Sequence, residues 1–219
     1  MCDHIIQLYT EEDALIRTLV RFVGSGLEQG EATVVIAVPE HLAALMKRLG
    51  AKGSNVANAV DQGAFIAVDA ECCLAKFMID GMPDRAIFRS VMTAILDRIR
   101  DAGYRKIRLF GEMVTLLWEH NALGASVRLE ELWNEVIVEY QVCLLCAYRI
   151  DTSDPRLKRG ILHQIARSHS HSLSEDGDLL IDAVNGNGSA LASRAPKQWT
   201  RRQGAALGSR RVSSGRALK

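Results

Sequence analysis

The sequence lacks the features that direct a chain into a membrane or through a secretory route. It contains no run of about 18 apolar residues, so it predicts no membrane-spanning helix. Its first residues, MCDHIIQLYTEED, lack the basic segment that begins a signal peptide. We therefore expect a cytoplasmic protein that makes no membrane contact.

Cysteine is scarce and irregularly placed. The five residues are Cys2, Cys72, Cys73, Cys143 and Cys146, and an odd number without a framework spacing argues against a secreted disulfide fold. Cys143 and Cys146 have the CxxC form, but residues three apart on a strand point to opposite faces. We therefore interpret this pair as buried thiols, while the adjacent Cys72 and Cys73 leave a strained disulfide open.

Charge is distributed unevenly along the chain. No acidic residue follows Asp182, whereas the basic residues after it are Arg194, Lys197, Arg201, Arg202, Arg210, Arg211, Arg216 and Lys219. Of 27 basic and 26 acidic residues in all, the preceding part therefore holds 27 − 8 = 19 basic and 26 acidic side chains, a balance of −7. The composition of residues 185–219 predicts a disordered basic tail, able to make weak charge-based contacts with nucleic acid.

Apolar β-favouring runs alternate with helical patterns along most of the chain. Such alternation predicts an α/β fold, a mainly parallel sheet with helices on both faces. Thr10 is a plausible N-cap for the first helix, and Pro155 suggests a further helix over 154–167. The predicted strands are 4–9, 32–38, 64–68, 106–110 and 142–150. The predicted helices are 15–23, 41–49, 71–78, 85–102, 113–118 and 125–140.

The densest information lies in residues 103–150. A buried strand ends at Gly111 and is followed at once by Glu112 and a helical pattern. The next helix carries Leu129, Leu132, Trp133, Val136, Ile137 and Tyr140 on one apolar face, and its glutamates, Glu130 included, are predicted to lie off that face. A second strand then completes a crossover unit.

The segments GEMVTLLW, LEELWNEV and LLCAY, in this order and spacing, resemble the second half of the MEDS domain. This is the methanogen/methylotroph sensory domain, named from a repressor that responds to dichloromethane. The resemblance implies a RecA/KaiC-like three-layer fold that has lost the phosphate loop. It divides the chain into a sensory domain at 1–152, a helical extension at 153–184 and the tail at 185–219.

The turn after the first predicted strand agrees with the loss of the phosphate loop. Phosphate loops hold glycines followed by Lys and Ser or Thr, which wrap the phosphates. Here the turn reads YTEEDAL, and Glu11, Glu12 and Asp13 would repel a triphosphate. We therefore expect no ATP hydrolysis.

Polar residues follow several strands where ligands bind in open α/β sheets. Tyr9, His41, Asp69 and Glu112 end or follow successive predicted strands at one edge. Together with Met113 and Trp118 as apolar wall, they are the predicted ligand-binding residues. Glu112 has two alternative roles, as a catalytic or metal-binding acid or as a structural carboxylate that binds backbone amides, and Asp69 serves equally well as a helix N-cap.

No catalytic or metal-binding signature accompanies these residues. The chain has no Gly-x-Ser-x-Gly turn and no GxGxxG. His4 and His41 are predicted at opposite ends of the sheet, and His163, His169 and His171 share no zinc-type spacing with the cysteines. We predict no metal, no cofactor and no catalysis.

These observations favour a non-catalytic sensory domain that binds a small, apolar, hydrocarbon-derived ligand. The resemblance implies an output module in other family members, and none is recognised here. We therefore expect signalling through a protein partner, a kinase or a transcription regulator. The alternatives are a metal-dependent hydrolase using Glu112 and Asp69, and a partner-switching interaction module that binds no ligand.

The basic tail generates the first prediction. Because its composition cannot bury enough apolar surface to offset the entropy of ordering, truncation at Asn185 should leave the melting temperature unchanged within error. Thermal unfolding of the full and truncated chains measures this. A drop of many degrees would show that the tail packs on the body.

Overall fold

The computed structural model describes residues 3–150, 165, 167–173 and 179–180, all of them within the compact unit Met1–Gly188. Its main sheet has the order β3-β2-β6-β7-β1-β8-β9, in which every neighbouring pair is parallel except β8 with β9. The strands are β1 (His4–Tyr9), β2 (Ala32–Ala37), β3 (Phe65–Asp69), β6 (Ile107–Gly111), β7 (Cys143–Arg149), β8 (His171–Leu173) and β9 (Leu179–Leu180). The predicted α/β class with a mainly parallel sheet is confirmed.

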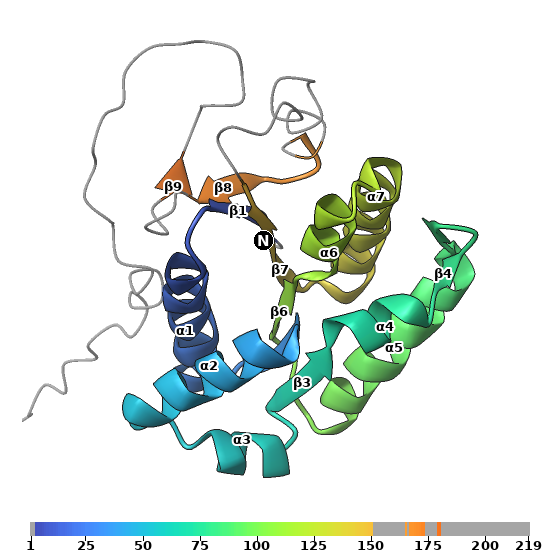
Figure 1. Ribbon diagram of the computed structural model, residues 1–219. Helices are drawn as coiled ribbons and strands as arrows, with labels where there is room; N and C mark the ends of the chain where they lie inside the picture. Colours follow the sequence, from blue (N-terminus) through green and yellow to red (C-terminus); the bar gives the residue numbers. More distant parts are fainter. Residues whose placement is uncertain (1–2, 151–164, 166, 174–178, 181–219) are drawn as a thin grey trace, which may run out of the picture. The chain divides into compact units, whose positions relative to one another are not determined.

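Helices cover both faces of this sheet (Figure 1). Side chains from α1, α2 and α3 pack in one core layer, and those from α4, α5, α6 and α7 pack in the other. The helices are α1 (Glu12–Glu28), α2 (Pro39–Ala51), α3 (Val56–Asp61), α4 (Ala70–Ala75), α5 (Arg85–Asp101), α6 (Met113–Glu119) and α7 (Leu123–Tyr140). A short antiparallel hairpin, β4 (Met78–Ile79) with β5 (Met82–Pro83), lies between α4 and α5.

The strand residues explain why both faces are covered. In β2, Val34 and Ile36 pack in the layer with α4–α7, whereas Val35 and Ala37 pack in the layer with α1–α3. Since successive side chains of a strand point to opposite faces, a continuously apolar strand must be buried on both. This is the pattern that predicted a central strand here.

Cys143 and Cys146 point to opposite faces as predicted, but only Cys146 is fully buried, because Cys143 has intermediate exposure. Cys146 is buried in the layer with α4–α7, and Cys143 packs against the opposite layer. Cys72 and Cys73 are free thiols, so they form no disulfide.

Two local predictions were wrong. The N-cap of α1 is Glu11 rather than Thr10, and it makes no side-chain capping hydrogen bond. Glu130 does not lie off the buried face of α7, because its exposed fraction is 0%. An acid is usually solvated, and the polar neighbours that compensate for its burial are described below.

The C-terminal part of the chain departs from the helical extension predicted at 153–184. β8 and β9 lie within that range, and β8 pairs in parallel with β1. The helix expected over 154–167 lies outside the described residues apart from Ile165 and Arg167, and the tail at 185–219 lies wholly outside them. Within the described part of the chain, no helix is long and apolar enough to cross a membrane.

The packing of α5 generates a stability prediction. Phe88 is 1% exposed, and its ring contacts Phe77 and Trp133 edge-on at centroid distances of 5.1 and 5.0 Å. Phe88→Ala should lower the free energy of unfolding by about 3–5 kcal/mol, measured by denaturant unfolding. Val138→Ala, at a side chain that is 78% exposed on α7, is the control and should change it by about 0.5 kcal/mol or less. Similar losses in both variants would contradict this packing.

Candidate functional site

The ends of two neighbouring strands bring His41 and Glu112 into contact. β2 and β6 are parallel neighbours, so the residues that follow them meet at one edge of the sheet. His41 Nδ1 lies 2.6 Å from Glu112 Oε1, and the Val38 backbone N–H donates to Oε2 at 3.0 Å. Glu112 is 2% exposed, so this is a nearly buried carboxylate with both oxygens engaged. The Val38 contact is the kind of backbone-amide contact expected if Glu112 has a structural role.

Tyr9 lies within reach of the same carboxylate charge. Its side chain ends β1 and is 2% exposed. Burial, followed by the Glu112 charge, raises the pKa of Tyr9 well above its ordinary value, so the phenol stays protonated. The hydrogen bond that His41 donates to the Glu112 carboxylate outweighs the effect of burial and raises the pKa of His41. Of the predicted ligand-binding residues, His41 and Glu112 are therefore in contact, and Tyr9 belongs to the same polar group through the Glu112 charge alone.

The other predicted residues lie apart from this group. Asp69 is the N-cap of α4, and its Oδ1 accepts the Cys72 backbone N–H at 2.8 Å. Met113 and Trp118 are buried in the layer with α4–α7, whereas Tyr9 packs in the opposite layer. The role of all these residues in ligand binding stays a prediction.

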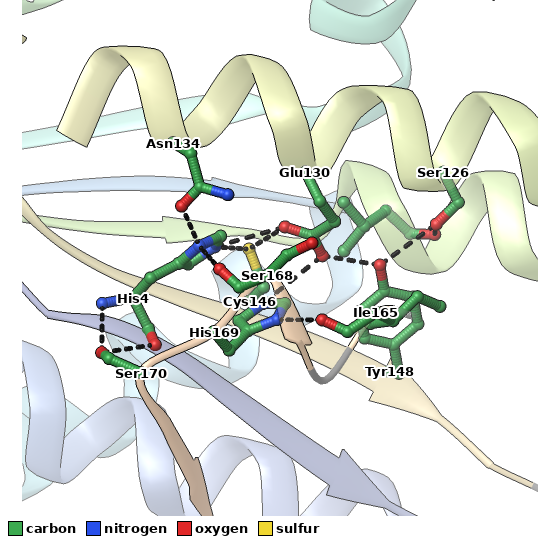
Figure 2. A network of polar contacts seen from close by, with 11 residues as sticks. His4, Ser126, Glu130, Asn134, Cys146, Tyr148, Ile165, Ser168, His169 and Ser170 are labelled. Carbon is green, nitrogen blue, oxygen red and sulfur yellow. Dashed lines mark hydrogen bonds and ion pairs between the residues drawn. The ribbon is translucent and has the colours of Figure 1, made fainter. Parts of the chain in front are cut away.

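A second polar group lies between α7 and the sheet, and we call it the buried polar cluster (Figure 2). Its side chains come from β1, α7, β7 and the segment that precedes β8. They are His4, Ser126, Glu130, Asn134, Cys146, Tyr148 and His169. Sequence reasoning did not find this cluster.

Glu130 is the centre of the cluster. The Tyr148 hydroxyl donates to its Oε1 at 2.6 Å, and the Cys146 thiol donates to its Oε2 at 3.5 Å. His4 Nε2 lies 3.2 Å from Oε2, and His169 Nε2 lies 3.5 Å from Oε1. Both oxygens of this fully buried carboxylate therefore have polar neighbours.

Both histidine rings are oriented by oxygen acceptors at Nδ1. His4 Nδ1 lies 2.9 Å from the Ser168 carbonyl oxygen and 2.9 Å from Asn134 Oδ1. His169 Nδ1 lies 2.7 Å from the Ile165 carbonyl oxygen. Because a carbonyl oxygen can only accept, each Nδ1 carries the hydrogen, and in the neutral ring Nε2 presents a lone pair to the cluster.

Burial sets the protonation states around Glu130. It lowers the pKa of His169 to about 4, so this ring is neutral near pH 7. It raises the pKa values of the Cys146 thiol and the Tyr148 phenol, which keeps both groups protonated as donors. Burial also acts to raise the pKa of Glu130, whereas the positive charge of a protonated His169 or His4 and the hydrogen bond from Tyr148 act to lower it, and the net shift is downward.

A family model matches most of the chain. The model of MEDS, the methanogen/methylotroph, DcmR sensory domain, covers residues 3–170. The chain belongs to the MEDS family. This match extends past the boundary predicted at residue 152 and includes His169 as well as the other members of the buried polar cluster.

The solved structures add support for the fold of this MEDS domain. The crystal structure of the KaiC-like protein PH0186 from the hyperthermophilic archaeon Pyrococcus horikoshii OT3 is similar, with a TM-score of 0.50 and 13% sequence identity. The similarity covers 78% of this chain and 71% of that chain. It confirms the RecA/KaiC-like fold and carries no functional information. No curated protein matches the chain.

The His41–Glu112 pair generates a pH prediction. Because the pKa of His41 is raised in the folded protein, the pairing contributes most stability below the ordinary histidine value, about 6.5, and loses it as pH rises through the folded-state pKa. His41→Gln should therefore lower the free energy of unfolding more at about pH 6 than at about pH 9.

Denaturant unfolding at both pH values measures this difference, and a double-mutant cycle with Glu112→Gln serves as its control. In the Glu112→Gln background, the additional loss caused by His41→Gln should no longer depend on pH over this interval. If His41→Gln alone lowers the free energy of unfolding equally at both pH values, the contact with Glu112 does not raise the pKa of His41.

Proposed function

We propose that this MEDS domain binds a small, apolar, hydrocarbon-derived ligand without catalysis and signals through a protein partner. Family membership supports the sensory and regulatory part of this role. The kind of ligand and the partner, a kinase or a transcription regulator, are inferences from that membership. A cytoplasmic location is expected from the composition of the chain.

The His41–Glu112 pair is the observation that carries the proposed ligand site. It places a nearly buried carboxylate, held by His41, at the carboxyl end of a central parallel strand. A few fixed polar groups against apolar walls are typical of small-molecule sites. In the proposed site His41 and Glu112 orient the ligand, and Met113, which directly follows Glu112, offers the nearest predicted apolar side chain. Trp118 and Asp69 were predicted for the same site but lie apart from the pair.

The residues after β1 disfavour nucleotide chemistry. Asp13, in the first turn of α1, forms ion pairs with Arg17 and Arg48. Glu12 adds a second acid to the same turn, and no lysine or glycine stands there to hold phosphates. We propose on this basis that the fold is used for binding rather than for ATP hydrolysis.

The metal-dependent hydrolase is less well supported. Its two acids would have to share a cation, but Asp69 already caps α4 and Glu112 binds His41 and the Val38 amide. Among the described residues, the metal-type grouping of side chains lies at the buried polar cluster and does not include either acid. Ligand binding therefore remains the better interpretation of this edge.

Substitution of Glu112 tests the proposed site. At about pH 9, where the His41 pairing contributes least, Glu112→Gln should change the free energy of unfolding without ligand by about 1 kcal/mol or less, because it keeps the shape and most hydrogen bonds. It should abolish the stabilisation that a binding ligand gives, which follows RT ln(1 + [L]/Kd). Thermal-shift measurements with dichloromethane and a panel of other small hydrocarbon derivatives provide the readout.

The matched control is Glu131→Gln on the exposed face of α7, which removes the same charge and should keep the ligand shift. A purely structural Glu112 predicts the opposite result. In that case Glu112→Gln would cost about 2 kcal/mol or more without ligand, and the surviving folded protein would retain its affinity. That outcome would remove Glu112 from the site.

A further inference from the structure

We propose that His4, Glu130, Cys146 and His169 form a binding site for one divalent transition-metal ion, with Zn²⁺ as the best-fitting ion. The site shares no residue with the ligand-binding edge at Tyr9, His41 and Glu112. The proposal is therefore independent of the proposed function, and either can fail without the other.

The donor atoms lie close enough together to surround one ion, and three of them have the separations of a tetrahedral site. The imidazole Nε2 atoms, the Cys146 Sγ and a Glu130 oxygen all lie within 4.8 Å of one another. His4 Nε2 is 3.2 Å from Glu130 Oε2 and 3.5 Å from Cys146 Sγ, which is itself 3.5 Å from Oε2. Zinc bonds of roughly 2.0–2.3 Å place the corners of a tetrahedron roughly 3.3–3.8 Å apart. The three separations among His4, Glu130 and Cys146 fall at or close to these edge lengths.

The neighbours of the donors are those of a metal site. Ligating histidines usually donate their other ring N–H to a carbonyl or carboxylate, which fixes the ring and directs the free nitrogen at the ion. Here the Ser168 and Ile165 carbonyl oxygens take that place, and Asn134 adds a second acceptor for His4. The Tyr148 hydroxyl similarly holds Glu130 through Oε1.

His169 provides an independent observation that points to a bound ion. Its side chain is 0% exposed, and its Nε2 is directed into the cluster without a hydrogen-bond partner. The 3.5 Å separation from Glu130 Oε1 is an ion pair only if the ring is protonated. A buried nitrogen lone pair without a donor is costly, and a cation at the centre of the cluster would satisfy it.

The donor set selects the kind of ion. Two imidazoles, one thiolate and one carboxylate suit Zn²⁺ and related late transition metals, whereas Ca²⁺ and Mg²⁺ prefer oxygen donors. Since four protein groups complete a tetrahedral shell, the site is closed in the manner of a structural zinc site. Binding requires the Cys146 thiol to release its proton to solvent and to coordinate as the thiolate.

The ion would connect parts of the chain that are far apart in sequence. His4 lies in β1, Glu130 in α7, Cys146 in β7 and His169 immediately before β8. One bound ion therefore fixes α7 and the β8 segment to the central sheet.

Cobalt titration of the full chain, stripped of metal with a chelator, tests the proposal. Co²⁺ should bind at one equivalent with intense visible bands of tetrahedral coordination and a near-ultraviolet thiolate-to-cobalt band, and Zn²⁺ should displace it. Cys146→Ser should remove the thiolate band. Cys143→Ser, on the same strand but the opposite face, should keep it. Glu112→Gln should also leave the spectrum unchanged.

A second variant keeps the proposal testable if Cys146→Ser does not fold. His169→Gln removes one donor and should weaken Co²⁺ binding by at least about tenfold. Zn²⁺ should also raise the melting temperature of the wild-type chain more than that of this variant. Absence of a thiolate band in the wild type, or an unchanged spectrum in a folded Cys146→Ser or His169→Gln variant, would overturn the assignment.

Discussion

The fully buried carboxylate of Glu130 is the constraint on which this structure depends most. Removal of an ionised group from water is very unfavourable unless polar partners replace the lost hydration. Those partners are the Tyr148 hydroxyl, the Cys146 thiol and the rings of His4 and His169. Because they belong to separate segments, α7 reaches its native environment only when β1, β7 and the residues before β8 are also in place.

Much of the fold follows from local pattern. The apolar run of Val34, Val35, Ile36 and Ala37 in β2 predicts a strand covered on both faces, and Val34 and Val35 do pack in opposite layers. Parallel strands also place the residues that follow them at one edge, which is why the contact between His41 and Glu112 was predictable from strand ends alone. These inferences use residue type and spacing over short stretches of chain.

The buried polar cluster depends on information that short stretches do not contain. Glu130 was assigned to solvent because an acid beside an apolar stripe is usually exposed. A usable signal was the recurrence of Ser126, Glu130 and Asn134 every fourth residue, which places three polar side chains on one strip of α7. The partners of that strip, His4 and His169, are 165 positions apart, so no local spacing could pair them.

The strand β8 was also not predicted, because its support comes from a distant part of the chain. Its sequence, HSL, has no strand pattern, and pairing with Ile5–Gln7 of β1 supports it. On that side of β1, the Ser170 N–H and hydroxyl also donate to the His4 carbonyl oxygen. An uncovered edge strand is a template for adding a strand from another chain, either a specific partner or an aggregating copy. β8, with β9 beyond it, thus covers β1, and its release would expose β1 as an edge strand to which another chain could add.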